Sequence, residues 1–167
     1  MTNVKIALDK PDDYAARSEL MYVCSWGCNG ILSNGAGYSG WPMHSIEHAL
    51  SAYFDITHGA GLAIITPRWM KEILCERTVE RFVTLGKGLF CFDQNLPDME
   101  MAKEVIDAFY AFFEGIGIPM HLGELGVKAE KIDEMADHIL AFDSTNEPWM
   151  YAPIGKDALV RILTASM

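Results

Sequence analysis

The sequence predicts an all-α protein, a single compact helical domain of about six to eight helices across residues 1–167. Apolar residues recur at helical spacing along nearly the whole chain. No stretch of five or more residues alternates convincingly between polar and apolar positions, as an exposed strand would. Half of the residues are hydrophobic, which suffices for a sizeable core and argues against a disordered chain.

Capping and helix-breaking residues indicate where each expected helix begins and ends. Pro11, followed by two aspartates, is typical of a helix N-terminus, and Pro67 is expected to end or kink the helix that contains it. Asp98 is expected to cap a further helix, which stops before Pro119. In chain order, we expect helices at about residues 11–33, 43–54, 58–74, 78–89, 98–115, 128–142 and 156–164.

The charge balance excludes several classes of partner. The chain carries 13 Lys and Arg against 23 Asp and Glu, a formal net charge of −10. Nucleic-acid backbones and anionic membrane surfaces bind clustered Lys and Arg, which this chain lacks. No apolar run approaches the about 18 residues of a membrane span, and residues 1–13 lack the apolar core of a signal peptide. We therefore expect a cytoplasmic protein with no nucleic-acid partner and no membrane partner.

The four cysteines show no paired C-x-x-C spacing of the kind that holds a structural metal. They lie in apolar segments, where a free thiol behaves as a small hydrophobic side chain. We expect four buried, free thiols in a reducing compartment: Cys24, Cys28, Cys75 and Cys91.

The stretch from residue 42 to 61 carries three of the five histidines of the chain. His44 and His48 are four residues apart, so they share one face of a helix and can converge on one point. His58 follows a break at residues 55–57, and its position depends on that turn. Imidazole is the commonest protein ligand for Zn or Fe at neutral pH. The cluster predicts metal binding or proton transfer, with structural or surface histidines as the alternative.

The segment 44-HSIEH-48 also matches H-x-x-E-H, the signature of a class of zinc peptidases. A zinc hydrolase of this type would bind zinc through His44 and His48, and Glu47 would activate a water molecule. It would need a third ligand, for which Glu124 is a candidate, and it would give His58 no role. Our main interpretation of Glu47 is instead a solvated acid on a helix face, because glutamate is rarely buried.

Residues 40–70, GWPMHSIEHALSAYFDITHGAGLAIITPRWM, resemble the C-terminal helical domain of the iron-containing (group III) alcohol dehydrogenases, in particular their butanol-dehydrogenase branch. The matched features are the spacing of the three histidines, the glycines that follow the third histidine and the apolar run up to Pro67. The resemblance extends more loosely over nearly the whole chain. It implies an all-helical, dehydroquinate-synthase-like domain.

The resemblance also implies a set of roles. One divalent metal, Fe or Zn, lies between this domain and a nucleotide-binding domain, and His44 and His58 are two of its ligands. His48 is not a ligand but a catalytic, proton-relaying neighbour. The cation acts as a Lewis acid on a small alcohol or aldehyde substrate, while hydride moves to or from NAD(P)H. Trp149, in the loop at 143–155, is a candidate substrate contact, although our main interpretation is an aromatic that anchors a surface loop.

The sequence departs from the family in one large respect. The N-terminal nucleotide-binding domain has no counterpart here, nor have the first two metal ligands, an Asp and a His four residues later. Glu134 and His138 share a helix face and could in principle replace them, but our main interpretation is a solvated pair on an amphipathic helix. We therefore expect an isolated chain that is inactive: an excised domain, a truncated reading frame or one half of a split enzyme.

Expected partners follow from this departure. The missing N-terminal half would complete the enzyme, or an exposed apolar patch would promote a homodimer in which part of the first helix is exchanged. A non-catalytic helical remnant or interaction module is the alternative function. The sequence leaves open the substrate, NADH versus NADPH, iron versus zinc and the oligomeric state.

Overall fold

The computed structural model describes residues 1–35, 40–142, 145–147 and 150–167, and every regular element in these residues is helical. They form eight α-helices and three short 3-10 turns, with no strand among them, which confirms the predicted all-α class. None of these helices combines the length and the apolar character needed to cross a membrane. The chain divides into two compact units, Met1–Ser39 and Gly40–Met167.

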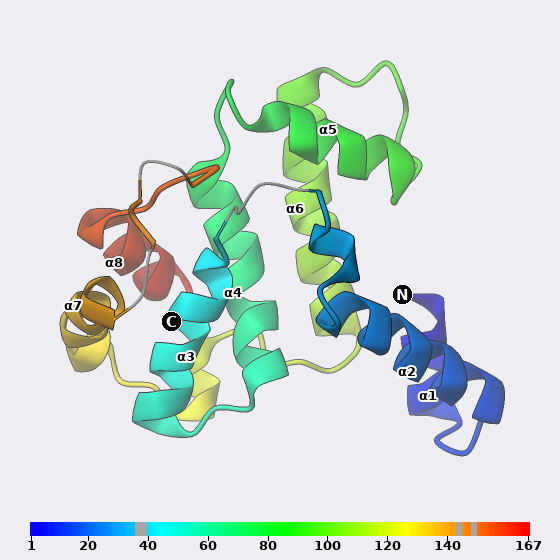
Figure 1. The fold of residues 1–167 in the computed structure, drawn as a ribbon, viewed down its shortest axis with the longest axis horizontal. Coiled ribbons are helices and arrows are strands. Elements are labelled where there is room, and N and C mark those ends of the chain that lie inside the picture. Colours follow the sequence, from blue (N-terminus) through cyan, green and yellow to red (C-terminus); the bar gives the residue numbers. More distant parts are fainter. Residues whose placement is uncertain (36–39, 143–144, 148–149) are drawn as a thin grey trace. The chain divides into compact units, whose positions relative to one another are not determined.

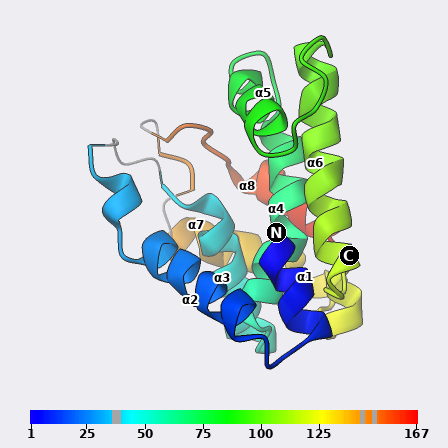
Figure 2. The ribbon, with the colours of Figure 1, turned by 90° about the vertical axis from the view of Figure 1, so that its right-hand side faces the viewer.

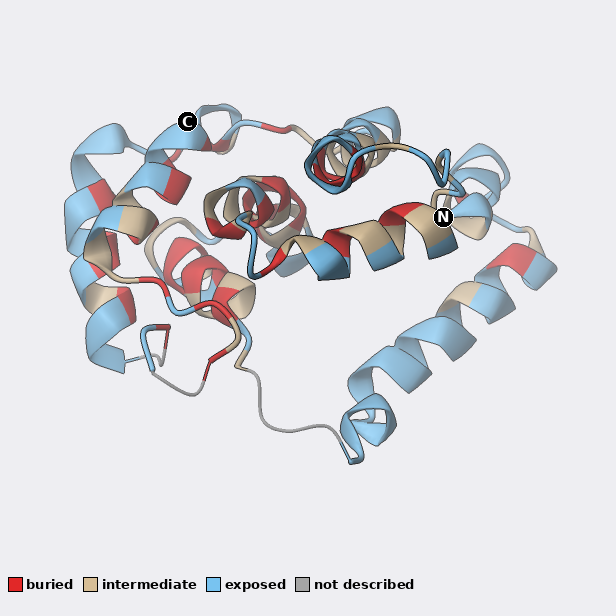
Figure 3. Ribbon diagram, turned by 90° about the horizontal axis from the view of Figure 1, so that it is seen from above, coloured by how far each residue is buried: buried red, intermediate tan, exposed pale blue. Residues whose placement is uncertain are grey.

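The first unit is a pair of helices, α1 (Thr2–Asp9) and α2 (Tyr14–Cys28), followed by a 3-10 turn at Ile31–Ser33. The Asp13 side chain caps α2 by accepting a hydrogen bond of 2.9 Å from the Ala16 amide. Ala16 is the single buried residue of α2, and the rest of that helix is mostly exposed (Figure 3). The large apolar side chains exposed on this helix are Tyr14, Met21, Tyr22, Val23 and Trp26. The expected homodimer with helix exchange stays a prediction.

The second unit is built around helix α4, which packs against α3, α6 and α8. Helix α5 lies along α6, and α7 contacts both α3 and α8 (Figures 1 and 2). The helices of this unit are α3 (Pro42–Phe54), α4 (His58–Ile73), α5 (Val79–Gly88), α6 (Asp98–Gly115), α7 (Ile132–Phe142) and α8 (Lys156–Ala165). Two 3-10 turns, Leu122–Leu125 and Ala129–Lys131, precede α7.

One core of aliphatic and methionine side chains holds the second unit together. The buried residues lie along the inward faces of its helices (Figure 3). Full burial of one such side chain stabilises the fold by about 1.5–3 kcal/mol before entropy is counted. The largest fully buried apolar side chains are Ile46, Leu50, Ile64, Ile65, Met101, Leu122, Met135, Ile139, Leu159, Ile162 and Leu163.

The helix boundaries differ from those expected in a few places. Helix α1 was not expected. The first expected helix, at 11–33, is shorter: α2 spans Tyr14–Cys28, and Gly30, left-handed with φ of 77°, leads into the separate 3-10 turn. Helix α4 continues through Pro67 rather than ending there. Asp98 does not cap α6: Pro97 takes the N-cap position, and Asp98 lies in the first turn, where its charge still complements the helix dipole.

The four cysteines are free, as expected, but all of them are exposed rather than buried. Cys24 and Cys28 lie on α2, where apolar side chains are exposed in general. Cys75 and Cys91 lie in the segments that follow α4 and α5, outside the packed faces of these helices.

Candidate metal centre

Helix α3 places the first two histidines of the candidate site on one face. The helix begins at Pro42, whose fixed backbone angle suits the first turn, and Trp41 precedes it. His44 and His48 are one helical turn apart, and their ring centroids lie 6.0 Å from each other. His44 is partly buried and His48 is exposed.

A tight turn brings the third histidine back to this face. Helix α3 ends at Phe54, and its C-cap residue Asp55 adopts a left-handed conformation with φ of 54°, which Asp tolerates better than most residues. Helix α4 begins three residues later at His58 and packs along α3 (Figure 1). The short connection therefore returns His58 to the level of His44 and His48.

The three imidazoles form a compact cluster. One ring nitrogen from each of His44, His48 and His58 lies within 4.8 Å of the corresponding atoms of the other two. The His58 ring centroid is 5.1 Å from that of His44 and 5.4 Å from that of His48. Two ligands of one Zn or Fe ion at about 2.1 Å each are separated by at most about 4.2 Å, so these ring nitrogens need only small side-chain adjustments to close on a cation.

Glu47 does not have the role that the sequence indicated. It is fully buried, with an exposed fraction of 0%, so the interpretation as a solvated acid on a helix face is wrong. Its Oε2 accepts a hydrogen bond from Nδ1 of His58, and its Oε1 accepts one of 2.5 Å from the Ser51 hydroxyl. The Ser51 oxygen also lies 2.8 Å from the carbonyl oxygen of Ile56, in the turn before His58.

The burial of Glu47 also argues against the zinc-hydrolase alternative. A glutamate that activates water must present its carboxylate to the metal-bound water, whereas both oxygens of Glu47 are occupied by His58 and Ser51. The peptidase arrangement also gives no role to His58, which lies inside the cluster. Glu124, its candidate third ligand, is exposed in a 3-10 turn and does not belong to the cluster.

The environment favours the form of His44 that binds metals. Partial burial is the main cause that lowers the pKa of His44 below its usual value. The charges of the nearby His58 and His48 lower the pKa further, and Glu47 only partly opposes this. The neutral imidazole, which is the ligand form, therefore predominates at neutral pH. The Trp41 ring lies 5.0 Å from the His44 ring at an interplanar angle of 69°, so an indole borders the cluster on one side.

Other residues considered from the sequence lie away from the cluster. Within the described part of the chain, the groups that could hold a metal ion together are His44, His48 and His58, without Glu134 or His138. Glu134 instead forms an ion pair with Lys131 at 2.6 Å. Trp149, the candidate substrate contact, lies outside the described residues. Ser51 was not predicted as a site residue, although its place one turn after Glu47 on the same helix face could have indicated one.

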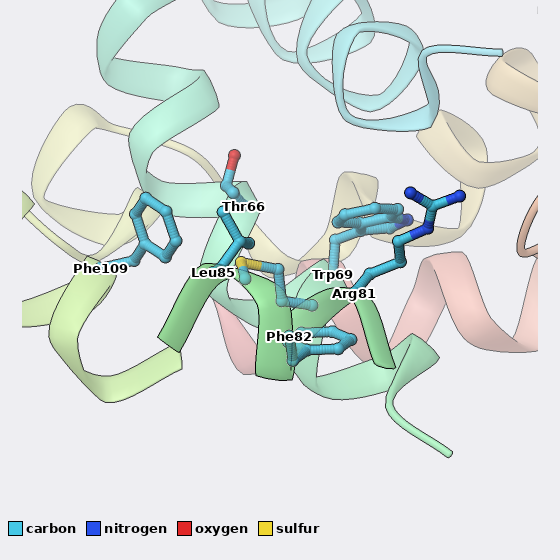
Figure 4. Close-up of a pocket in the computed structure, with 7 residues that line it drawn as sticks. Thr66, Trp69, Arg81, Phe82, Leu85 and Phe109 are labelled. Atoms are coloured by element: carbon cyan, nitrogen blue, oxygen red, sulfur yellow. The ribbon is translucent and has the colours of Figure 1, made fainter. Parts of the chain in front are cut away.

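A separate cavity of about 260 Å³ lies at the other end of α4, between α4, α5 and α6. The rings of Trp69, Phe82 and Phe109 surround it, with the Arg81 side chain beside Trp69 (Figure 4). No imidazole lines this cavity. The indole N–H of Trp69 is buried and has no hydrogen-bond partner among the described residues. The cavity is thus distinct from the histidine cluster.

The whole chain, residues 1–167, matches the sequence profile of the Fe-containing alcohol dehydrogenase family, C-terminal part. Over 132 residues it is 46% identical to NADH-dependent butanol dehydrogenase A of Clostridium acetobutylicum, a match that covers 79% of this chain and 34% of that protein. Over 163 residues it is 35% identical to probable NADH-dependent butanol dehydrogenase 2 of Bacillus subtilis, covering 96% of this chain and 41% of that protein. The chain thus spans well under half the length of these relatives.

Solved structures show the same fold. The crystal structure of NADH-dependent butanol dehydrogenase A from Thermotoga maritima superposes with a TM-score of 0.87 at 29% identity, over 99% of this chain and 42% of that one. The aldehyde reductase YqhD of Escherichia coli superposes with a TM-score of 0.82 at 26% identity, over 96% of this chain and 41% of that one.

Proposed function

Because the chain belongs to the Fe-containing alcohol dehydrogenase family and corresponds to its C-terminal part, we propose that it supplies the metal-binding helical domain of an NAD(P)H-linked alcohol dehydrogenase. The observation that carries the proposal is the convergence of His44, His48 and His58 within 4.8 Å. The names of the relatives, NADH-dependent butanol dehydrogenases, support a small alcohol or aldehyde as the substrate and NADH as the nucleotide.

The donor set fits a divalent transition metal. Three imidazoles are borderline-soft nitrogen donors that suit Zn or Fe, while the buried carboxylate is already bonded to His58 and is not offered to the ion. His44 and His58 are the proposed ligands. When bound, the cation would supply Lewis-acid polarisation of the alcohol or aldehyde oxygen.

The residues of this chain would then divide the remaining work. His48 is exposed, lies beside both proposed ligands and is the proposed carrier of the alcohol proton to solvent. The Trp41 indole, next to His44, would limit the access of water to one side of the reacting centre. Catalytic sites of this kind usually have three protein ligands, so we propose that further ligands and the nucleotide site come from residues outside 1–167, and that the isolated chain is inactive.

Metal titration of the 167-residue chain tests the ligand assignment. Zn²⁺ and Fe²⁺ are titrated under anaerobic conditions into wild type, His44→Ala/His58→Ala and His48→Ala. We expect the double variant to lose more affinity than the about 10- to 100-fold typical of removing an outer hydrogen-bond partner, and His48→Ala to retain most of its affinity.

His138→Ala is the matched control, because His138 lies on α7 and does not belong to the cluster. Equal metal affinity in the double variant and in this control would contradict the ligand assignment. No metal binding by wild type would instead favour the non-catalytic helical module. A loss of affinity in His48→Ala as large as that in His44→Ala/His58→Ala would make His48 a third ligand rather than a proton carrier.

A complementation experiment tests the enzymatic part of the proposal. The N-terminal portion of a butanol-dehydrogenase relative is added in trans to this chain, and aldehyde-dependent oxidation of NADH and NADPH is followed. Restored activity that depends on His44 and His58 is expected. Absence of activity at every ratio of the two parts would count against a split or separable enzyme, while the metal titration would still decide on the site.

A further inference from the structure

Glu47 is the one fully buried acidic residue among the described residues of the second unit, and it lies next to the histidine cluster. A carboxylate removed from water is costly unless its oxygens accept hydrogen bonds. Both oxygens of Glu47 do so, one from Nδ1 of His58 and one from the hydroxyl of Ser51. His58 and Ser51 therefore fix the position of the carboxylate, and the carboxylate in turn fixes the position of the His58 ring.

The contact with Nδ1 decides which nitrogen of His58 can bind a cation. In neutral imidazole one nitrogen carries the proton and the other carries the free lone pair. A carboxylate accepts a hydrogen bond, so it stabilises the tautomer that is protonated on Nδ1. Nε2 then keeps its lone pair and becomes the ligand atom. The same contact fixes the orientation of the ring.

Two neighbouring residues keep Glu47 in this position. A Cβ atom on Gly61 would lie 2.6 Å from Cγ and 2.8 Å from Oε1 of Glu47, so the carboxylate occupies space that only glycine leaves open. The Ser51 hydroxyl lies within hydrogen-bond distance of both Oε1 of Glu47 and the carbonyl oxygen of Ile56, in the turn that leads into His58, and it donates its single proton to one of them at a time. Residues from α3, the turn and α4 thus form one hydrogen-bonded unit around the His58 ring.

We propose that Glu47 is a positioning residue that presets His58 as a ligand through Nε2, with Ser51 and Gly61 as its supports. This proposal rests on the proposed metal-binding function. It assigns Glu47 neither to the first coordination sphere nor to the activation of water. It also gives Gly61, three residues after His58 on α4, a physical reason, which is to make room for a buried acid.

The first test compares metal affinity in two variants that each remove one negative charge. Glu47→Gln keeps the size of the side chain, and Glu104→Gln is the control on α6, where Glu104 is exposed. We expect Glu47→Gln to weaken Zn²⁺ binding by about 10- to 100-fold and the control to bind as wild type does. Equal affinity in wild type and both variants would overturn the proposal. Circular dichroism confirms that each variant is folded.

The second test needs no metal. Nuclear magnetic resonance of the ¹⁵N-labelled imidazoles reports the tautomer of His58 in the metal-free chain. We expect the Nδ1-protonated form in wild type and a shift toward the Nε2-protonated form in Glu47→Leu, which has no polar atom to accept the proton. Ser51→Ala and Gly61→Ala should cause smaller shifts in the same direction. An Nε2-protonated His58 in wild type would overturn the proposal.

The two tests separate this proposal from the function on which it rests. If wild type binds no metal, the proposed function fails, and the tautomer comparison still decides whether Glu47 controls His58. If wild type binds metal and His44→Ala/His58→Ala does not, but Glu47→Gln changes neither affinity nor tautomer, then only the role of Glu47 is wrong.

Discussion

The two ends of helix α4 face different surroundings. At its N-terminal end, His58 and Gly61 pack against α3 around a buried carboxylate, and the oxygens of Glu47 have hydrogen-bond partners. At its C-terminal end, Trp69 borders an apolar cavity, and its N–H has no partner among the described residues. Directional hydrogen bonds fix side-chain positions at the first end, while non-directional apolar contacts at the second end leave empty volume. One helix can therefore supply a binding site and a packing surface independently.

The largest expected effect comes from truncating a buried side chain beside the apolar cavity at the C-terminal end of α4. Phe82 is 4% exposed, and Phe82→Ala should lower the free energy of unfolding by about 3–5 kcal/mol, since truncation enlarges a cavity that is already present. Urea denaturation measures this loss, and a zinc titration of the folded variant should give the wild-type affinity. Thr84→Ala, an exposed position on the same helix, serves as the control. A change in zinc affinity in Phe82→Ala would show that the two ends are coupled.

The next effect concerns the space occupied by Glu47. Gly61→Ala forces a methyl group against Glu47 and should lower the free energy of unfolding by about 1–3 kcal/mol. Gly59→Ala, two residues earlier on α4, meets no atom within 4 Å and should instead raise stability by about 0.5–1 kcal/mol through helix propensity. Thermal and urea unfolding of both variants measure the difference. Similar stability changes at the two glycines would mean that Glu47 can move aside without cost.

The smallest expected effect comes from the unpartnered indole. Trp69→Phe removes a buried N–H that has no acceptor, which is favourable, and some buried apolar area, which is unfavourable. The two terms oppose each other, so the free energy of unfolding should change by less than about 1 kcal/mol. Equilibrium unfolding of wild type and Trp69→Phe measures this change in the free energy of unfolding. A large loss would reveal a partner for the indole, such as a bound water.

Much of the fold could be predicted from the chain alone, because helix periodicity and capping are local properties. The helix at Pro42–Phe54 and the start of α4 at His58 agree with the predicted positions. Helix α1 was missed because eight residues with a mixed apolar pattern give too weak a signal. The cysteines were expected to be buried, since composition reports how apolar a segment is and not whether another segment covers it.

The candidate site was predictable only in part. The spacing of His44 and His48 already placed both on one helix face, since that relation depends on helix geometry alone. Whether His58 joined them depended on the turn at Asp55, and the structure brings all three ring nitrogens together. Which of the histidines bind a metal stays a proposal.

The sequence by itself determined the helical class, the spacing of the histidines and the family to which the chain belongs, because each depends only on local pattern and residue identity. Only the tertiary structure decided the role of Glu47. The acid lies on the same helix as His44 and His48, yet its partner is His58, eleven residues away on α4. Burial depends on which helix packs on which face, and here the packing of α4 on α3 set Gly61 and His58 against the carboxylate.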